Sequence, residues 1–196
     1  MRDIWYADNR DLVKWGVLLE LAAMHGIPRI LQIAYYRPSE FGSLVIDGQE
    51  YSIRPEVLAH FRNLRNIADL HSDVRVTVFD RPFLDREEYR EAATRFISAF
   101  HGQPSIVFLD PDTGLEPQNP APEHVIEKEA KAIWETMKIG DMIVFYQHQT
   151  NLKGEPWIEP KRDQLARALG IPTQALKVAS GPSIARDVVF FFAKKA

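Results

Sequence analysis

Residues 105–116, SIVFLDPDTGLE, decide the fold and point to a site. The run from Ser105 to Leu109 carries no charge and is mostly β-branched or aromatic, which is typical of a strand buried on both faces. A turn-forming group, residues 110–114, follows at once and places Asp110 and Asp112 directly after the strand. Because ligands bind at the carboxyl ends of strands in open α/β sheets, we expect a site at this turn.

The segments on either side alternate between helical and extended patterns. Apolar residues at helical spacing predict helices over residues 11–25, 55–70, 86–100, 123–138 and 161–169. Extended apolar runs predict strands over residues 29–36, 74–79, 105–109, 142–146, 175–179 and 187–193. Two further β-prone runs flank Asp47-Gly48, a dipeptide suited to a two-residue hairpin turn.

Strands separated by amphipathic helices imply right-handed crossovers. We therefore predict an α/β fold with a mainly parallel, doubly wound, Rossmann-like sheet, helices on both faces and an antiparallel terminal strand pair. A chain of 196 residues suits one domain, residues 1–196. This combination resembles the architecture of the Rossmann-like methyltransferases.

Composition limits the possible partners and location. A net charge of −3 gives no general reason to bind nucleic acid or an anionic membrane, although a local basic patch would still allow nucleic-acid binding. The chain has no cysteine, which excludes disulfides and thiolate metal sites. No apolar run approaches the ~18 residues of a membrane span, and the first residues lack the apolar core of a signal peptide. We expect a cytoplasmic protein.

Three polar clusters should converge at the carboxyl edge of this sheet. Crossover helices run antiparallel to the strands, so the amino end of the first helix should lie beside the loops that follow Leu109 and Tyr146. Such convergence is what a binding site requires. The clusters are Asp8, Asn9, Asp11 and Lys14; Asp110, Asp112, Thr113 and Glu116; and Gln147, His148 and Gln149.

The same residues resemble a protein family. Asp8-x-x-Asp11-x-x-Lys14-Trp15-Gly16, then DPDTGLE, then Tyr146-Gln147-His148 are similar to a group of uncharacterised bacterial proteins that carry D-x-x-D-x-x-K-[YW]-G, DPDNGLE and YQH in this order. Thr113 stands where that group has Asn. The resemblance implies no activity, only that these positions act together.

Structural and functional roles both fit the acidic turn and the histidine. Asp110 and Asp112 would either accept backbone N–H groups of the turn, or bind a divalent cation or a substrate amino group. His148 is either a satisfied polar residue at a strand end, or a general base or ligand, because an unperturbed histidine titrates near neutrality.

The remaining candidates also have two interpretations. Asp8 and Asp11 suit helix capping and Lys14 an ion pair with Asp11 on the helix surface, whereas a site would use all three to bind substrate or cofactor. Thr113, Glu116 and Gln147 complete that set, and Gln147 suits recognition of a base or amide edge. Arg186-Asp187, just before the last strand, either forms a structural ion pair, the interpretation we favour, or reaches the rim of the site.

Three functions follow from these residues. The first is an enzyme that uses S-adenosylmethionine to methylate an amino group; amino-methylating members of the methyltransferase class carry an acidic or amide residue before Pro-Pro, and Asp110-Pro111 is similar to that start. Asp112 replaces the second proline, and residues 34–37 contain no glycine for close approach of the cofactor. The second is a metal-dependent nuclease or phosphatase in which Asp110 and Asp112 hold Mg²⁺. The third is a non-catalytic module that binds a nucleotide or a partner at the same edge.

Overall fold

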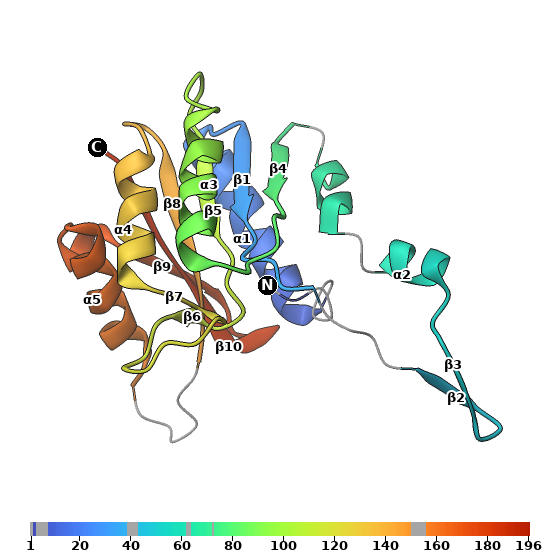
Figure 1. Cartoon of the computed structure of the whole chain (residues 1–196). Helices are drawn as coiled ribbons and strands as arrows, with labels where there is room; N and C mark the ends of the chain where they lie inside the picture. Colours follow the sequence, from blue (N-terminus) through green and yellow to red (C-terminus); the bar gives the residue numbers. More distant parts are fainter. Residues whose placement is uncertain (1, 3–7, 39–42, 62–63, 72, 150–155) are drawn as a thin grey trace.

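The computed structural model describes residues 2, 8–38, 43–61, 64–71, 73–149 and 156–196. Its centre is a six-stranded sheet in the order β4-β1-β5-β8-β10-β9 (Figure 1). The strands are β1 (Arg29–Ile33), β4 (Arg75–Phe79), β5 (Ile106–Leu109), β8 (Met142–His148), β9 (Lys177–Gly181) and β10 (Ala185–Lys194).

The pairing of these strands confirms the predicted fold class. β1 pairs in parallel with β4 and β5, and β5 in parallel with β8. β10 is antiparallel to both β8 and β9, which makes the terminal pair. The chain passes from β1 to β4 on one side and later returns to β5 on the other, so the strand order reverses at β1. In open α/β sheets this reversal marks the crevice where ligands bind.

Helices cover both faces of the sheet (Figure 1). α1 (Asn9–His25) contacts β1, β9 and β10 on one face. The other face carries α3 (Arg86–Ser98), α4 (Glu127–Thr136) and α5 (Ile158–Leu169). The alternation along β5 follows from this arrangement: Ile106 and Phe108 pack with α1, whereas Val107 and Leu109 pack under α3 to α5.

α1 begins and ends where its sequence predicts. Asp8 is the N-cap, and its Oδ1 accepts hydrogen bonds from the backbone N–H groups of Arg10 (2.8 Å) and Asp11 (3.0 Å). Gly26 ends the helix in the left-handed conformation, with φ of 61°. The amino end of α1 is thereby fixed at the carboxyl edge of the sheet.

Several predicted boundaries were wrong. The helix predicted over residues 55–70 is two elements, α2 (Pro55–Phe61) and the 3₁₀ helix η2 (Leu64–Asp69), and residues 62–63 lie outside the described part. α2 lies away from the sheet (Figure 1), so no neighbouring surface buries a continuous stripe; Val57 is exposed. The strand predicted to end at 146 continues to His148, because β10 pairs with it along that whole length.

Two short sheets complete the chain. β6 (Gly114–Leu115) and β7 (His124–Val125) pair in parallel within the segment predicted as loop and helix start. β2 (Leu44–Ile46) and β3 (Gln49–Tyr51) form the predicted hairpin about Asp47-Gly48, separate from the main sheet. None of the helices in the described part of the chain has the length and apolar character needed to cross a membrane.

Candidate functional site

A pocket of about 500 Å³ lies at the carboxyl edge of the sheet. Most of the residues proposed from the sequence line it, and they come from three distant segments. Those in the lining are Asp8, Asp11, Lys14, Asp110, Asp112, Thr113 and His148. The three polar clusters therefore meet around one cavity, beside the paired ends of β1 and β5.

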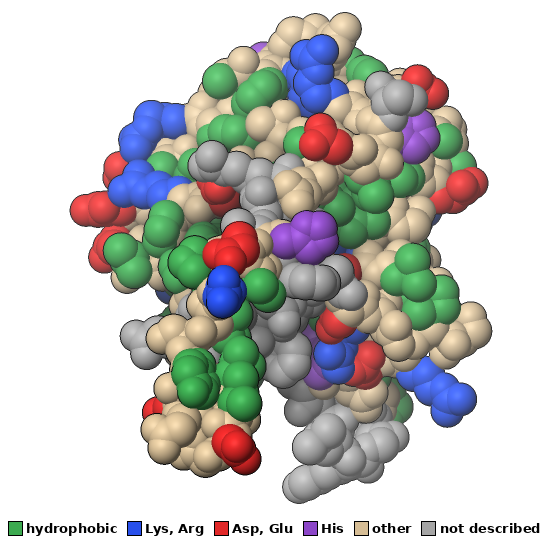
Figure 2. Space-filling model, turned by 90° about the vertical axis from the view of Figure 1, so that its right-hand side faces the viewer, with side chains coloured by type: hydrophobic (Ala, Val, Ile, Leu, Met, Phe, Trp, Pro, Cys, Tyr) green, Lys and Arg blue, Asp and Glu red, His purple; other side chains and the backbone are tan. Residues whose placement is uncertain are grey.

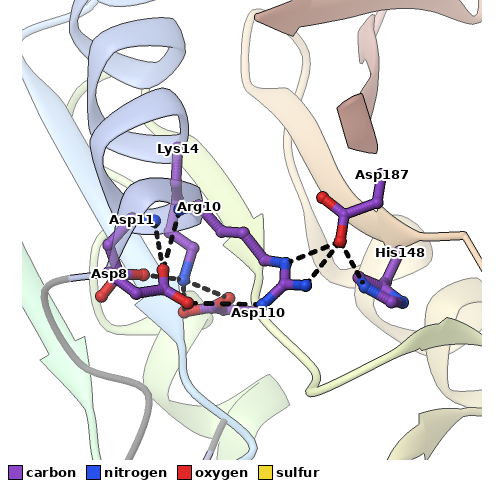
Figure 3. Close-up of polar contacts among 7 residues, drawn as sticks. All are labelled: Asp8, Arg10, Asp11, Lys14, Asp110, His148 and Asp187. Carbon is purple, nitrogen blue, oxygen red and sulfur yellow. Dashed lines mark hydrogen bonds and ion pairs between the residues drawn. The ribbon is translucent and has the colours of Figure 1, made fainter. Parts of the chain in front are cut away.

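Lys14 is the centre of the buried part of this site (Figure 3). Its Nζ lies 2.5 Å from Asp11 Oδ1 and 3.0 Å from Asp110 Oδ1, and its side chain is almost fully buried. The ammonium also faces the ring of Tyr146 at 5.4 Å. The predicted Asp11–Lys14 ion pair exists, but it lies inside the protein and includes a second carboxylate from β5's end.

The charges of this group depend on one another. Burial alone would lower the pKa of Lys14, but the carboxylates of Asp110 and Asp11 raise it well above its ordinary value. Burial raises the pKa of Asp110, and the Lys14 ammonium opposes that rise. Gln32 adds a 2.7 Å hydrogen bond from Nε2 to Asp110 Oδ2. Asp110 is thus a buried acid whose negative charge is balanced by the Lys14 ammonium.

A second group links α1 to β8 and β10 on the pocket wall (Figure 3). The Arg10 guanidinium donates to Asp187 Oδ2 from Nη2 at 2.5 Å and from Nε at 3.1 Å. The same oxygen lies 3.0 Å from His148 Nε2. Although desolvation acts to raise it, the pKa of Asp187 is lowered by Arg10, with a smaller contribution from His148. A histidine held by a carboxylate has a defined orientation and tautomer.

The acidic turn is held from the loop after β1. The Arg37 guanidinium bonds Asp112 and lies 3.5 Å from Glu123. Thr113 donates its hydroxyl to the carbonyl of Glu123 at 2.9 Å. The partner of Asp112 is therefore a basic side chain from another loop, and its role is more than that of a turn residue that accepts backbone N–H groups.

Two predicted site residues lie outside the pocket lining. Glu116 Oε1 accepts the backbone N–H of Glu127 at 2.7 Å, which caps the start of α4. Gln147 is completely buried and its side chain accepts from Leu115 N–H at 2.9 Å and donates to the carbonyl of Thr113 at 3.3 Å. Both hold the acidic turn in place without facing the cavity.

Gly114 explains why Gln147 can do this. Its φ is 122°, and a Cβ at this position would lie 2.5 Å from the amide atoms of Gln147. The Gln147 amide therefore packs directly on the backbone of the turn, a contact that requires glycine. The GLE and YQH motifs are joined by this contact, next to His148.

Sequence reasoning missed several pocket residues. The missed lining residues are Arg2, Arg10, Arg37 and Glu123, and Tyr146 was indicated only by the resemblance of the YQH motif. Asp187, expected to pair with Arg186, instead lies within β10 and bonds Arg10 and His148. The sequence marks Asp187 only as an acidic residue in an otherwise apolar run. Nothing in its spacing indicates that its partners lie 177 and 39 residues away.

The site is poorly suited to a divalent cation. Among the described residues, no group of three or more His, Asp or Glu side chains is arranged to hold a metal ion. The two carboxylates proposed to hold Mg²⁺ each have a basic partner: Lys14 Nζ lies 3.0 Å from Asp110 Oδ1, and the Arg37 guanidinium bonds Asp112. These basic side chains balance the charges that a metal ion would otherwise neutralise.

Comparisons with known proteins add little to this geometry. No family model matches the chain, and no match was found among curated proteins. A crystal structure of a fibrillarin/Nop5p complex is similar with a TM-score of 0.41 at 11% sequence identity, over 87% of this chain and 74% of that one. A similarity of this size carries no argument about function. Any inference about function therefore depends on the residues of the site itself.

Proposed function

We propose that the pocket binds S-adenosylmethionine and that the protein transfers its methyl group to an amino group of a second substrate. The observation that carries this proposal is the position of the pocket, beside the ends of β1 and β5 where the strand order reverses, with His148 in its lining and bonded to Asp187.

The charges of the pocket favour a ligand with both signs. Among the residues that the structure describes, five acidic and four basic side chains line it, and Arg10, Arg37 and Glu123 remain partly exposed there. The methionine part of S-adenosylmethionine has an ammonium and a carboxylate, which suit such a mixture. A polyphosphate suits it less, because Asp8 already occupies the N–H groups at the start of α1.

The turn after β1 can accommodate a cofactor without glycine. Tyr35 has φ of 44°, the left-handed conformation that a glycine would otherwise supply. Its side chain is buried against Phe83 and Tyr89, under α3, and is not part of the pocket lining. Tyr35 therefore stays out of the pocket, and the side chain that this turn contributes to the lining is the Arg37 guanidinium.

The pocket residues would divide the work of methyl transfer among themselves. S-adenosylmethionine supplies an electrophilic methyl group, and the acceptor must present a neutral amine. In a neutral imidazole that donates Nε2–H to Asp187, Nδ1 is an acceptor, and there His148 takes the proton that the acceptor nitrogen loses. Asp112 and Glu123 orient the amine before transfer, and Asp110 holds the turn through Lys14.

Isothermal titration calorimetry with S-adenosylmethionine and with S-adenosylhomocysteine tests the binding step. We expect both to bind wild-type protein and H101Q, a control at an exposed histidine before β5. Methyl transfer to a panel of amines should fall about 10²–10⁴-fold in H148Q and remain unchanged in H101Q. Absence of heat with either nucleoside would contradict the proposal, and heat from Mg²⁺ instead would favour the phosphoester hydrolase.

A further inference from the structure

The β2–β3 hairpin is an arm that no other described part of the chain covers. It projects away from the sheet (Figure 1), and every residue from Leu44 to Tyr51 is exposed. Apolar side chains lie on its surface in Figure 2, which faces this side of the molecule. A two-stranded hairpin alone is at best marginally stable in water, whereas three or more strands with an apolar face are stable.

The composition of β2 is that of an interior strand. Leu44, Val45 and Ile46 are three consecutive apolar residues, a pattern expected where both faces of a strand are buried. Here Val45 is 66% exposed and Ile46 59%. Cross-strand pairing puts Leu44 opposite Tyr51, which gives one face of the hairpin an apolar surface.

The turn geometry shows which backbone groups are available for pairing. Asp47 and Gly48 have φ of 56° and 77°, as in a type I′ turn. In such a hairpin the residues that flank the turn, Ile46 and Gln49, form a hydrogen-bonded pair, so the next pair, Val45 and Glu50, is not hydrogen-bonded. The N–H and C=O groups of Val45 therefore point outward along the open edge of β2.

We propose that β2 pairs antiparallel with β2 of a second copy of this chain, about a two-fold axis at Val45. Val45 then exchanges two backbone hydrogen bonds with its counterpart, and Leu44 lies opposite Ile46 of the other copy. The result is a four-stranded sheet with one continuous apolar face. It satisfies the pairing and stability requirements that the isolated hairpin lacks.

Charge selects β2 over β3 for this contact. Self-pairing through β2 joins neutral residues only. Self-pairing through β3 would set Glu50 directly opposite Glu50 of the other copy, and like charges in that position are destabilising. The arm thus has one self-complementary edge and one edge that repels its own copy, independent of what the pocket binds.

Two matched proline variants test the assignment by sedimentation equilibrium over a range of protein concentrations. Proline removes a backbone N–H, and V45P and E50P each remove one that the hairpin itself does not use. We expect the mass of the wild type and E50P to rise toward that of two chains, while V45P stays at one chain. Thermal unfolding should be the same for both variants at low concentration.

Three results would overturn the proposal. A wild type that remains a single chain at every concentration would leave the β2 edge to a strand of another protein. Dimerisation of V45P equal to that of the wild type would exclude the β2 edge. Loss of the dimer in both variants to the same extent would show that the contact is not specific to β2.

Discussion

Two buried aspartates, Asp110 and Asp141, lie at opposite edges of the same sheet and are held in different ways. At the amino edge, Asp141 accepts backbone N–H groups from Ser105 at 2.9 Å and Lys138 at 3.0 Å. At the carboxyl edge, Asp110 is bound by the ammonium of Lys14, which comes from 96 residues away. Both side chains are almost inaccessible to water.

The difference separates a structural edge from one built for a ligand. Asp141 accepts one backbone N–H from Lys138 in the adjacent turn and one from Ser105 before β5, so these bonds tie the starts of β5 and β8 together. The bonds of Asp110 come from side chains of α1 and β1, and they lie beside a pocket. The side-chain charges about Asp110 can exchange partners with a ligand in the pocket, whereas the bonds of Asp141 join two strands of the sheet.

The largest expected effect comes from removing the cation at each edge. K14M leaves Asp11 and Asp110 buried without their counter-ion, and it should lower the free energy of unfolding by about 3–5 kcal/mol. K138M leaves Asp141 with its backbone bonds and should cost less than about 1 kcal/mol. Urea unfolding of the two variants measures both values.

A double variant provides the control for this comparison. K14M/D110N removes one of the two stranded carboxylates and should recover part of the stability that K14M loses. Equal losses for K14M and K138M would show that the two edges do not differ in the way described here.

Two glycines, one at each edge, give the next largest difference. Gly140 has φ of 93° and a Cβ there would reach only Pro104, at 3.9 Å, so G140A should cost about 1–2 kcal/mol from backbone strain. G114A adds overlap with the Gln147 amide and should cost about 1–3 kcal/mol more. Thermal unfolding tests this order, and recovery in G114A/Q147A would identify the overlap as the cause.

The stability lost in K14M should become smaller at acid pH. Without the ammonium, the pKa of Asp110 rises further above its ordinary value of 3.8. A carboxyl with a raised folded pKa contributes stability that is present below pH 3.8 and is lost as the pH rises through the folded pKa. Every tenfold weakening of this acid in the folded state corresponds to about 1.4 kcal/mol. Unfolding measured from acid to neutral pH checks this trend; a pH-independent gap would contradict it.

The smallest stability effect is expected at the exposed Arg10–Asp187 pair. R10Q should change the free energy of unfolding by less than about 1 kcal/mol, because both side chains are more than a third exposed. The lowered pKa of Asp187 should return toward 3.8. That pair therefore contributes stability above pH 3.8 that is lost as pH falls through the lowered pKa. Carbon-13 titration of Asp187 measures the change in its pKa. If R10Q lost as much stability as K14M, the Arg10–Asp187 pair would not be the weak, exposed contact proposed here.

Much of the fold was predictable because local pattern and burial agree. The uncharged run into Leu109 and the abrupt change at Asp110 identified the central strand and its turn, and Asp8 and Gly26 bounded α1. The helix over residues 55–70 failed because only its second half, η2, packs against the sheet, at β4, whereas α2 lies away from it.

The site was predictable only in part, for a related reason. Asp110 and Asp112 follow β5 and His148 is the last residue of β8, so their edge of the sheet can be inferred from topology. Arg10 and Asp187 meet through long side chains across 177 residues, and neither position has a local pattern that indicates a site. Gln147 looked like a ligand contact because its partner, the backbone about Gly114, is defined only by the folded turn.

Chemical-shift mapping with S-adenosylmethionine tests the central claim most directly, because it compares the two edges in one titration. We predict that the amide resonances that shift lie at residues 8–14, 110–114 and 146–148, while those of residues 102–105 and 138–141 remain unchanged. No shifts, or shifts centred on the amino edge, would contradict the assignment of the carboxyl edge as the ligand-binding site.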